Sequence, residues 1–240
     1  MASPSPSTDK TIHFIRHGES TFNQWRLRSI LTFSWIFVKD PMIIDARLSA
    51  QGKLQVAALK KVIQERKLHE IVDVIITSPL TRAIETTLGG FDGCHIPIQG
   101  THLPCVEVRI LLRVINCAVS PLCREMLDTA CDIGRQPQEL AHEFGSAGID
   151  TTSLADYWWL SHPTAATMTI PQSAEEVAPL RESVADLDAR ILAFLHLLRD
   201  LPQTNIAVVG HSSFIKRLTK ATRKLANCEI HTTTLHQCLK

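Results

Sequence analysis

The chain reads Thr11-Ile12-His13-Phe14-Ile15-Arg16-His17-Gly18-Glu19 close to its start. The apolar first half of this stretch predicts a buried β-strand, which delivers Arg16 and His17 at its carboxyl end. A second apolar run, Asn205–Gly210, is followed directly by His211. Two strands that each end at a histidine indicate one pocket assembled from opposite ends of the chain.

Helix and strand signals alternate between these two runs. Apolar residues recur at helical spacing from Ala50 to about Lys67, with Ser49 as the expected N-cap. A buried strand is predicted over Val72–Thr77. The pair Ser78-Pro79 then opens a helix, which the pair Gly89-Gly90 ends.

The alternation continues in the second half of the chain. An apolar stripe predicts a long amphipathic helix from Ala174 to about Arg199, in which Ser173 and Glu176 form a capping box. This helix leads into the strand Asn205–Gly210, and another helix is expected from Ser212 to Leu225. The order predicts an α/β fold, a three-layer α/β/α sandwich with a mostly parallel central sheet. Its functional groups should lie beyond the carboxyl ends of the strands.

Length and composition set the outer limits. The 240 residues suit a single domain, expected over 11–240, behind a Ser/Pro-rich arm, 1–10, that we expect to be disordered. A formal net charge of +1 favours neither nucleic acid nor an anionic membrane as a partner. The most apolar window, Ile30–Val38, is far shorter than the roughly 20 residues of a bilayer span. Seven scattered cysteines and the absence of a leader sequence predict a cytoplasmic protein with reduced thiols.

Several separated blocks give the chain a resemblance to the histidine phosphatase superfamily, also called the phosphoglycerate mutase-like family. Its R-H-G-E signature is here Arg16-His17-Gly18-Glu19, its S-P-L-x-R-A-x-x-T block is Ser78–Thr86, and its late G-H block is Gly210-His211. Two shorter blocks, Leu48–Gly52 and Leu122–Glu125, are similar to its L-[ST]-x-x-G helix entry and its L-x-E segment. The blocks follow the family's order, so the resemblance spans most of the chain.

The resemblance implies that His17 is a nucleophile that attacks phosphorus and forms a phosphohistidine, while Arg16, Arg82 and His211 bind the phosphoryl oxygens. Attack needs a neutral imidazole, and two nearby guanidinium groups disfavour the imidazolium form. Planar guanidinium donors also stabilise the charge that develops on phosphoryl oxygens. The physical chemistry of these residue types therefore agrees with the implied roles.

Three further side chains are candidates for the same pocket. Glu125 is expected to protonate the leaving alkoxide and then to deprotonate the hydrolytic water. In the alternative interpretation, Glu125 only forms a surface ion pair with Arg124 or Arg109. Glu19 is expected to orient its neighbours and to balance the arginines. Asn23 matches an asparagine that contacts phosphate in family members, although an asparagine in such a loop also serves as a turn former.

Three regions leave alternatives open. The apolar stretch Gln99–Cys117 does not fit the family pattern and is either an extra buried strand, a lobe that faces a partner, or an insertion from an unusual gene model. The pair Trp158-Trp159, in the loop Thr151–Thr169, either covers the pocket or packs in the core. The segment Trp25–Ile44, apolar and partly basic, is a second candidate rim for substrate recognition.

Other chemistries find no support in the sequence. The histidines and cysteines lack zinc-ligand spacing, no G-x-S-x-G elbow is present, and there is no P-loop, so neither a metal nor a cofactor is expected. The prediction is a phosphatase that hydrolyses a phosphorylated small-molecule substrate through phospho-His17. The second hypothesis is mutase-type transfer of the phosphoryl group between substrate hydroxyls. Phe22 argues against it, because glycolytic mutases usually carry a tryptophan at this position before Asn23. A non-catalytic scaffold that binds phospholigands is the third alternative.

Overall fold

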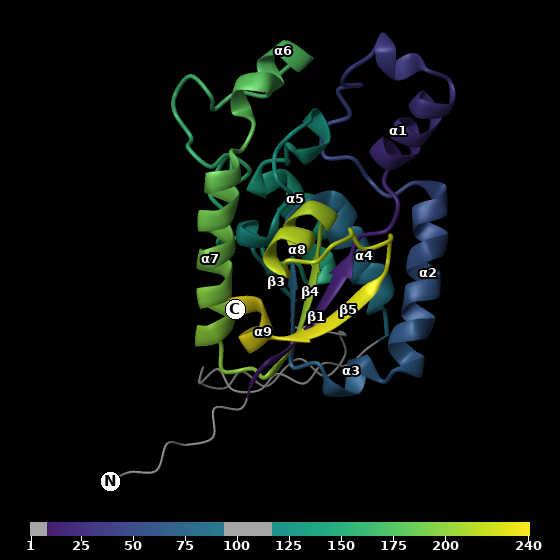
Figure 1. Ribbon diagram of the computed structural model, residues 1–240, viewed down its shortest axis with the longest axis vertical. Helices are drawn as coiled ribbons and strands as arrows, with labels where there is room; N and C mark the ends of the chain where they lie inside the picture. Colours follow the sequence, from purple (N-terminus) through teal and green to yellow (C-terminus); the bar gives the residue numbers. More distant parts are fainter. Residues whose placement is uncertain (1–8, 94–116) are drawn as a thin grey trace.

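A five-stranded sheet forms the centre of the computed structural model, which describes residues 9–93 and 117–240 (Figure 1). The strand order within this described part is β3-β2-β4-β1-β5. The strands are β1 (Thr11–Arg16), β2 (Val74–Thr77), β3 (Cys117–Val119), β4 (Asn205–Gly210) and β5 (Ile230–Thr234). Neighbouring strands pair in parallel except β1 and β5, which are antiparallel. The predicted mostly parallel sheet is therefore confirmed.

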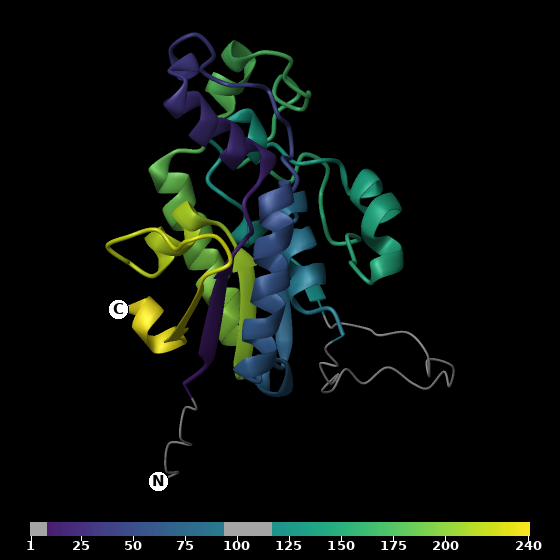
Figure 2. The ribbon, with the colours of Figure 1, turned by 90° about the vertical axis from the view of Figure 1, so that its right-hand side faces the viewer.

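Helices cover both faces of the sheet, as Figures 1 and 2 show. One face packs against α7 (Val184–Asp200), α8 (Ser212–Leu218) and α9 (Leu235–Leu239), and the other against α2 (Ala50–Glu65) and α4 (Thr81–Gly90). Alternate residues of a strand point to opposite faces. Ile12 and Phe14 of β1 accordingly lie in the first core cluster, whereas Ile15 lies in the second. This arrangement is the predicted α/β/α sandwich.

The remaining elements lie beyond or beside the sheet. They are α1 (Thr21–Leu31), the 3₁₀ helix η1 (Ser34–Ile36), α3 (Leu68–Ile71), α5 (Pro137–Phe144) and α6 (Ala174–Val177), with short 3₁₀ helices η2 (Pro121–Cys123), η3 (Ala130–Asp132), η4 (Gly145–Ala147) and η5 (Ala178–Leu180). Figure 1 shows α1 and α6 at the end to which the parallel strands point. Trp158 and Trp159 are 6% and 0% exposed in a third core cluster, so the pair packs in the core and does not cover the pocket.

Several predicted boundaries are confirmed. The strands β1 and β4 have the predicted bounds, and α2 begins after Ser49, whose hydroxyl accepts from Gly52 N at 3.0 Å. The helix ends at Glu65 instead of Lys67, because Lys67 takes a left-handed φ of 54° before α3 begins.

The predicted helix from Ala174 to Arg199 is wrong in its middle. The structure has α6, then η5, and a new helix α7 that begins at Val184. Pro179 lacks the N–H that a continuous helix needs. Ser183 caps the second helix by accepting from Asp186 N at 3.1 Å. Ser173 caps the first, as predicted, but the Glu176 carboxylate accepts from Gln172 N instead of closing the box.

Three other boundaries also differ. The strand β2 begins at Val74, because Val72 closes the short helix α3. The helix α4 begins at Thr81, after the Ser78-Pro79 pair, and Asp45 accepts from Thr81 N at 2.8 Å. The helix α8 ends at Leu218 instead of Leu225.

Two predictions fall wholly or largely outside the described residues. They concern the arm 1–10, of which only Asp9 and Lys10 are described, and the stretch Gln99–Cys117, of which only Cys117 is described. His236 N donates to the Asp9 carboxylate at 3.0 Å, and Leu235 N donates to Lys10 O at 2.9 Å. Across 9–93 and 117–240, no helix is long and apolar enough to cross a membrane.

Candidate active site

The carboxyl ends of β1 and β4 bring His17 and His211 together. These strands pair in parallel with Arg16 opposite Gly210, so the residue that follows each strand lies at the same edge of the sheet. The two imidazole rings have centroids 5.1 Å apart, and the side chains are 4% and 0% exposed. The two histidines from opposite ends of the chain are therefore brought together as predicted, and His211 lies buried behind the residues that line the cavity described below.

A hydrogen bond fixes the tautomer of His17. Its Nδ1 lies 2.6 Å from the carbonyl oxygen of Gly18. A carbonyl oxygen can only accept, so Nδ1 carries the proton and Nε2 keeps its lone pair. Burial, followed by the charges of Arg82 and Arg16, lowers the pKa of His17 well below its usual value. The ring is thus held neutral, with Nε2 as a potential nucleophile.

The second histidine lies beside the end of β2. His211 Nε2 is 2.8 Å from Ser78 Oγ, which also accepts from Leu80 N at 3.3 Å. This arrangement favours donation from the Ser78 hydroxyl to Nε2, which leaves the His211 proton on Nδ1. Burial, then Arg82 and His17, lower the pKa of His211 well below its usual value. His211 Nδ1 is buried and has no partner among the described residues.

The two predicted arginines reach the same place from different elements. Arg82, in the first turn of α4, donates from Nη1 to Cys131 O at 2.5 Å and from Nη2 to Asp132 Oδ1 at 2.9 Å. Arg16, at the end of β1, donates from Nη1 to Leu225 O at 2.7 Å. Each guanidinium has five N–H donors, so donors remain for a ligand.

Asp132 is a site residue that the sequence reasoning did not assign. Burial raises the pKa of its carboxyl to about 6, although Arg82 opposes this shift. Its Oδ2 accepts from the backbone N–H groups of Asp128 and Thr129, both at 3.3 Å. The only signal for it in the sequence was its place shortly after the L-x-E block.

Glu125 caps α8 and also lines the cavity that is described below. Its Oε1 accepts from Met126 N and Phe214 N, both at 3.1 Å, and its Oε2 accepts from Ser213 N at 3.2 Å. The alternative surface pair with Arg124 is wrong, because Arg124 donates to Glu182 at 3.0 Å. Arg109 lies outside the described residues.

A buried ionic cluster holds the segment that carries Glu125. Arg190 of α7 donates to the backbone carbonyls of Leu122 and Arg124, both at 2.9 Å, and pairs with Glu182 at 2.6 Å. The Glu182 side chain is 1% exposed. The sequence analysis assigned neither Arg190 nor Glu182 to the site. The available signal for Arg190 was the presence of a charged residue on the apolar face of a predicted helix.

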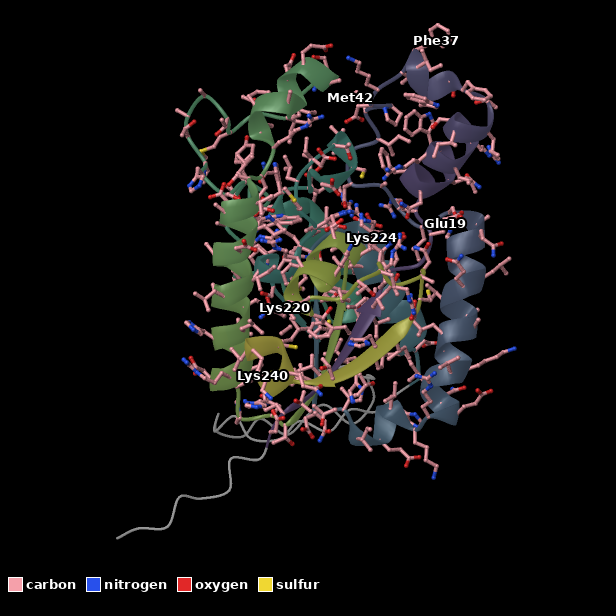
Figure 3. The ribbon with its side chains drawn as sticks, in the orientation of Figure 1. Glu19, Phe37, Met42, Lys220, Lys224 and Lys240 are labelled. Carbon is pink, nitrogen blue, oxygen red and sulfur yellow. The ribbon has the colours of Figure 1, made fainter. Side chains whose placement is uncertain are left out.

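Glu19 and Asn23 make local contacts around the loop that follows β1 and carries His17. Glu19, labelled in Figure 3, accepts from Ser49 Oγ at 2.6 Å and so ties the loop to the start of α2. Asn23 accepts from Ser20 N at 3.2 Å, while Ser20 Oγ accepts from Asn23 N at 3.1 Å, a capping box that begins α1. Asn23 also lines the cavity described next.

Part of this constellation, but not His211 or Glu19, lines a cavity of about 610 Å³. Its inner end is lined by Arg16, His17, Arg82, Glu125 and Asp132, and its outer part by residues of α1 and η1, within the predicted rim. A larger cavity of about 780 Å³, between α7, α8 and α9, is lined by no histidine, so the smaller cavity, which His17 lines, is the candidate active site. Among the described residues, no group of three His, Cys, Asp or Glu side chains is placed to hold a metal ion.

Comparison with known proteins bears on the resemblance and the fold. A model of the histidine phosphatase superfamily (branch 1) matches residues 12–101. Phosphoglycerate mutase-like protein 1 of Arabidopsis thaliana is 27% identical over 222 residues, which cover 86% of this chain and 69% of that protein. A probable phosphatase of Schizosaccharomyces pombe is 25% identical over 224 residues, which cover 90% of this chain and 80% of that protein.

One solved structure supports the architecture. A putative alpha-ribazole-5'-P phosphatase from Escherichia coli aligns with a TM-score of 0.51 and 17% identity, over 93% of this chain and 89% of that one. At this identity the likeness concerns the fold alone. The family match and the shared fold together confirm the resemblance predicted from the sequence blocks.

Proposed function

We propose that this chain of the histidine phosphatase superfamily is a metal-independent phosphatase, which hydrolyses phosphomonoesters of small molecules through a phosphohistidine on His17. The observation that carries the proposal is the neutral His17 ring, which keeps a lone pair on Nε2 and lines the same cavity as Arg16, Arg82 and Glu125. A relative named as a probable phosphatase adds support.

In the first step, His17 Nε2 attacks the phosphorus atom while the ester P–O bond breaks. The bonding electron pair leaves on the ester oxygen, which takes a proton from Glu125. Arg16, Arg82 and the Nδ1–H of His211 donate to the phosphoryl oxygens, where charge develops. Because these donors are already held by Leu225, Asp132 and Ser78, little reorganisation accompanies the reaction.

In the second step, water attacks the phosphorus of phospho-His17. Glu125, now ionised, accepts a proton from this water, and the P–N bond breaks. The electron pair returns to Nε2, and inorganic phosphate leaves. The Gly18 carbonyl keeps the Nδ1 proton in place throughout, so His17 is regenerated in the reactive tautomer.

The proposal is tested by hydrolysis of p-nitrophenyl phosphate in the presence of a chelator. Wild type, His17→Ala and the control His196→Ala, exposed on α7, are compared, with intact-mass detection of the phosphoenzyme after rapid quenching. Turnover and a trapped phosphoenzyme in wild type and in the control, but not in His17→Ala, are expected. A folded wild type that shows neither would overturn the proposal in favour of a scaffold.

The same experiment separates hydrolysis from mutase chemistry. Phosphoenzyme is mixed with water alone or with 3-phosphoglycerate, and the fate of the phosphoryl group is followed. Release as inorganic phosphate under both conditions is expected. Transfer mainly to the second substrate's hydroxyl would replace the phosphatase proposal with the mutase alternative.

A further inference from the structure

The outer half of the active-site cavity has an aromatic and apolar wall. This wall consists of Phe22, Trp25, Ile30, Trp35 and Met126. Trp35 is 52% exposed and Ile30 is 54% exposed, whereas most large apolar side chains of the described chain are buried. Apolar surface gathered at the mouth of a cavity is typical of a ligand-binding site.

The wall is held in a defined position. The Ser20–Asn23 capping box fixes the start of α1, and Thr21 N donates to Arg47 O at 2.8 Å. At the other end of the segment, Asp40 accepts from Ala130 N at 2.7 Å, beside the stretch that carries Asp132. The segment 20–40, which carries every residue of the wall except Met126, is therefore anchored at both ends to the same framework as the phosphate-binding groups.

Positive charge surrounds this wall without matching carboxylates. The cavity is lined by Arg26, Lys39 and Lys224, in addition to the inner arginines. Within 9–93 and 117–240, Arg26 and Lys39 form no ion pair, and Lys224 donates to Ser213 Oγ at 3.0 Å. Figure 3 shows Lys224 below α1.

The carboxylates of the cavity are already engaged. Asp132 pairs with Arg82, Asp128 pairs with Arg181 at 3.4 Å, and Glu125 accepts three backbone N–H groups. The lining contains six arginines and lysines against these three carboxylates, so its net charge is positive. It exceeds what binding of the phosphoryl group at Arg16 and Arg82 requires.

The cavity is also larger than a phosphoryl group alone would need. At about 610 Å³ it lies within the range of roughly 300–1,000 Å³ that encloses a drug-sized ligand. A phosphoryl group at the inner end would leave most of this space to the leaving group. The outer half therefore has room for a ring and a further polar group.

From these observations we infer that the substrate is a phosphomonoester whose leaving group combines a flat apolar body with a second anionic group. The apolar body packs against Trp25 and Trp35, and the anionic group binds among Arg26, Lys39 and Lys224. Hydrolysis breaks only the ester P–O bond, so the released alcohol or phenol keeps its anionic group. This inference rests on the proposed phosphatase function and names its substrate class.

Two probe esters with matched leaving groups test the charge requirement. One is 4-(carboxymethyl)phenyl phosphate and the other is its neutral amide, 4-(carbamoylmethyl)phenyl phosphate. The methylene group separates the acid from the phenol oxygen, so the chemistry at phosphorus is nearly the same. We expect kcat/KM for the acid to exceed that for the amide by at least tenfold in about 0.15 M salt, where distant charges are screened. A ratio near one in wild type would overturn the inference.

Variants locate the second subsite. At least one of Lys39→Met, Arg26→Met and Lys224→Met should bring the acid-to-amide ratio close to one. The control Lys61→Met, exposed on α2, should leave it unchanged. Because both probes carry the same phosphate, attraction of the phosphate by these cations cancels in the ratio. A preference that survives in all three variants would overturn the assignment of the subsite.

A second pair of variants tests the aromatic wall. Trp35→Ala should raise KM for both aryl probes by about tenfold with little change in kcat, the expected sign of lost uniform binding. Phe37→Ala is the control, since Phe37 is 87% exposed on the same segment, does not line the cavity and lies at the outer tip in Figure 3. An unchanged KM in Trp35→Ala would contradict the wall's role.

The two proposals fail in different ways. Failure of every ester to form phosphohistidine would contradict the phosphatase function itself. Equal formation of phosphohistidine from the acid and the amide would contradict only the substrate class. Rapid-quench measurement with both probes therefore assigns a negative result to one proposal or the other.

Discussion

Arg82 Nη2 donates to Asp132 Oδ1 at 2.9 Å, and the two side chains are only 3% and 7% exposed. Asp132 is itself fixed by backbone N–H groups of Asp128 and Thr129. Together with the bond from Arg82 Nη1 to Cys131 O, this pair sets the plane of the guanidinium beside His17. Under the proposed function, Asp132 is thus a positioning residue for Arg82.

Replacement of this carboxylate should weaken phosphate binding. In Asp132→Asn, an amide NH₂ must face either Arg82 or the N–H groups of Asp128 and Thr129, so donors oppose donors. We expect inhibition by vanadate to weaken about tenfold, and the free energy of unfolding to fall by roughly 1–3 kcal/mol. Enzyme assays and urea unfolding measure these two effects. Asp188→Asn, at an exposed ion pair with Arg217 outside this cavity, should change neither. Unchanged vanadate inhibition in Asp132→Asn would remove its positioning role.

Glu125→Gln tests proton transfer to the leaving group. The glutamine side chain keeps the length and one oxygen acceptor at the start of α8, but it cannot donate a carboxylic proton. The value of kcat/KM for alkyl phosphates should fall by roughly 10²–10⁴-fold, because general acid catalysis typically contributes that much. The loss for p-nitrophenyl phosphate should be far smaller, since its leaving group needs little protonation. Equal losses for both ester types would exclude Glu125 as the general acid. Glu175→Gln, exposed on α6, is the matched control.

The sequence allowed the position of the histidine pair to be predicted because local patterns determine it. Strands β1 and β4 are short apolar runs, and parallel strands place the residues that follow them at one edge. Ser49 could likewise be assigned as an N-cap from its hydroxyl and the helix that follows. These features depend on neighbours in the sequence and on the sheet that the alternation implies.

The partners of the arginines could not be predicted in the same way. Asp132 lies 50 residues from Arg82, and Arg190 meets the carbonyl of Leu122 across 68 residues, so both contacts exist only in the folded chain. The predicted helix through Pro179 failed for a related reason. Glu182 lies in the interior, where it pairs with Arg124 and Arg190. This tertiary contact lies at the break between η5 and α7, which the continuous apolar pattern of the sequence did not indicate.

Stability should decrease in weak acid because two buried histidines stay neutral in the folded state. The folded pKa values of His17 and His211 lie well below their usual value, chiefly through burial. Below about pH 6.5 the unfolded chain takes up protons at these histidines that the folded chain does not. Each histidine therefore lowers the free energy of unfolding by about 1 kcal/mol for each pH unit that the pH falls. In His211→Gln, the free energy of unfolding should fall less between pH 6.5 and 5 than in wild type, by about 1 kcal/mol per pH unit. Urea unfolding at several pH values measures this difference.

Two comparisons make this pH experiment specific. Asp132, with a raised pKa of about 6, has the opposite effect below pH 6, but it is present in both proteins and cancels in the difference. His142→Gln, exposed on α5, should reproduce the wild-type slope. An identical slope in His211→Gln would show that His211 is protonated in the folded protein.

The close packing of Gly52 against the loop that carries His17 should be required for activity. A Cβ at Gly52 would lie 2.0 Å from the carbonyl oxygen of Glu19, a backbone atom that can move only with the loop carrying His17. We expect Gly52→Ala to lose roughly 1–3 kcal/mol of stability, as overpacked cores do, and to lose phosphoenzyme formation even where it remains folded. Gly145→Ala is the matched control, because its φ is −60° and no atom lies within 4 Å of the added Cβ. It should be neutral or stabilise by about 0.4–1 kcal/mol through the unfolded chain. Wild-type phosphoenzyme formation in Gly52→Ala would mean that this contact does not position His17.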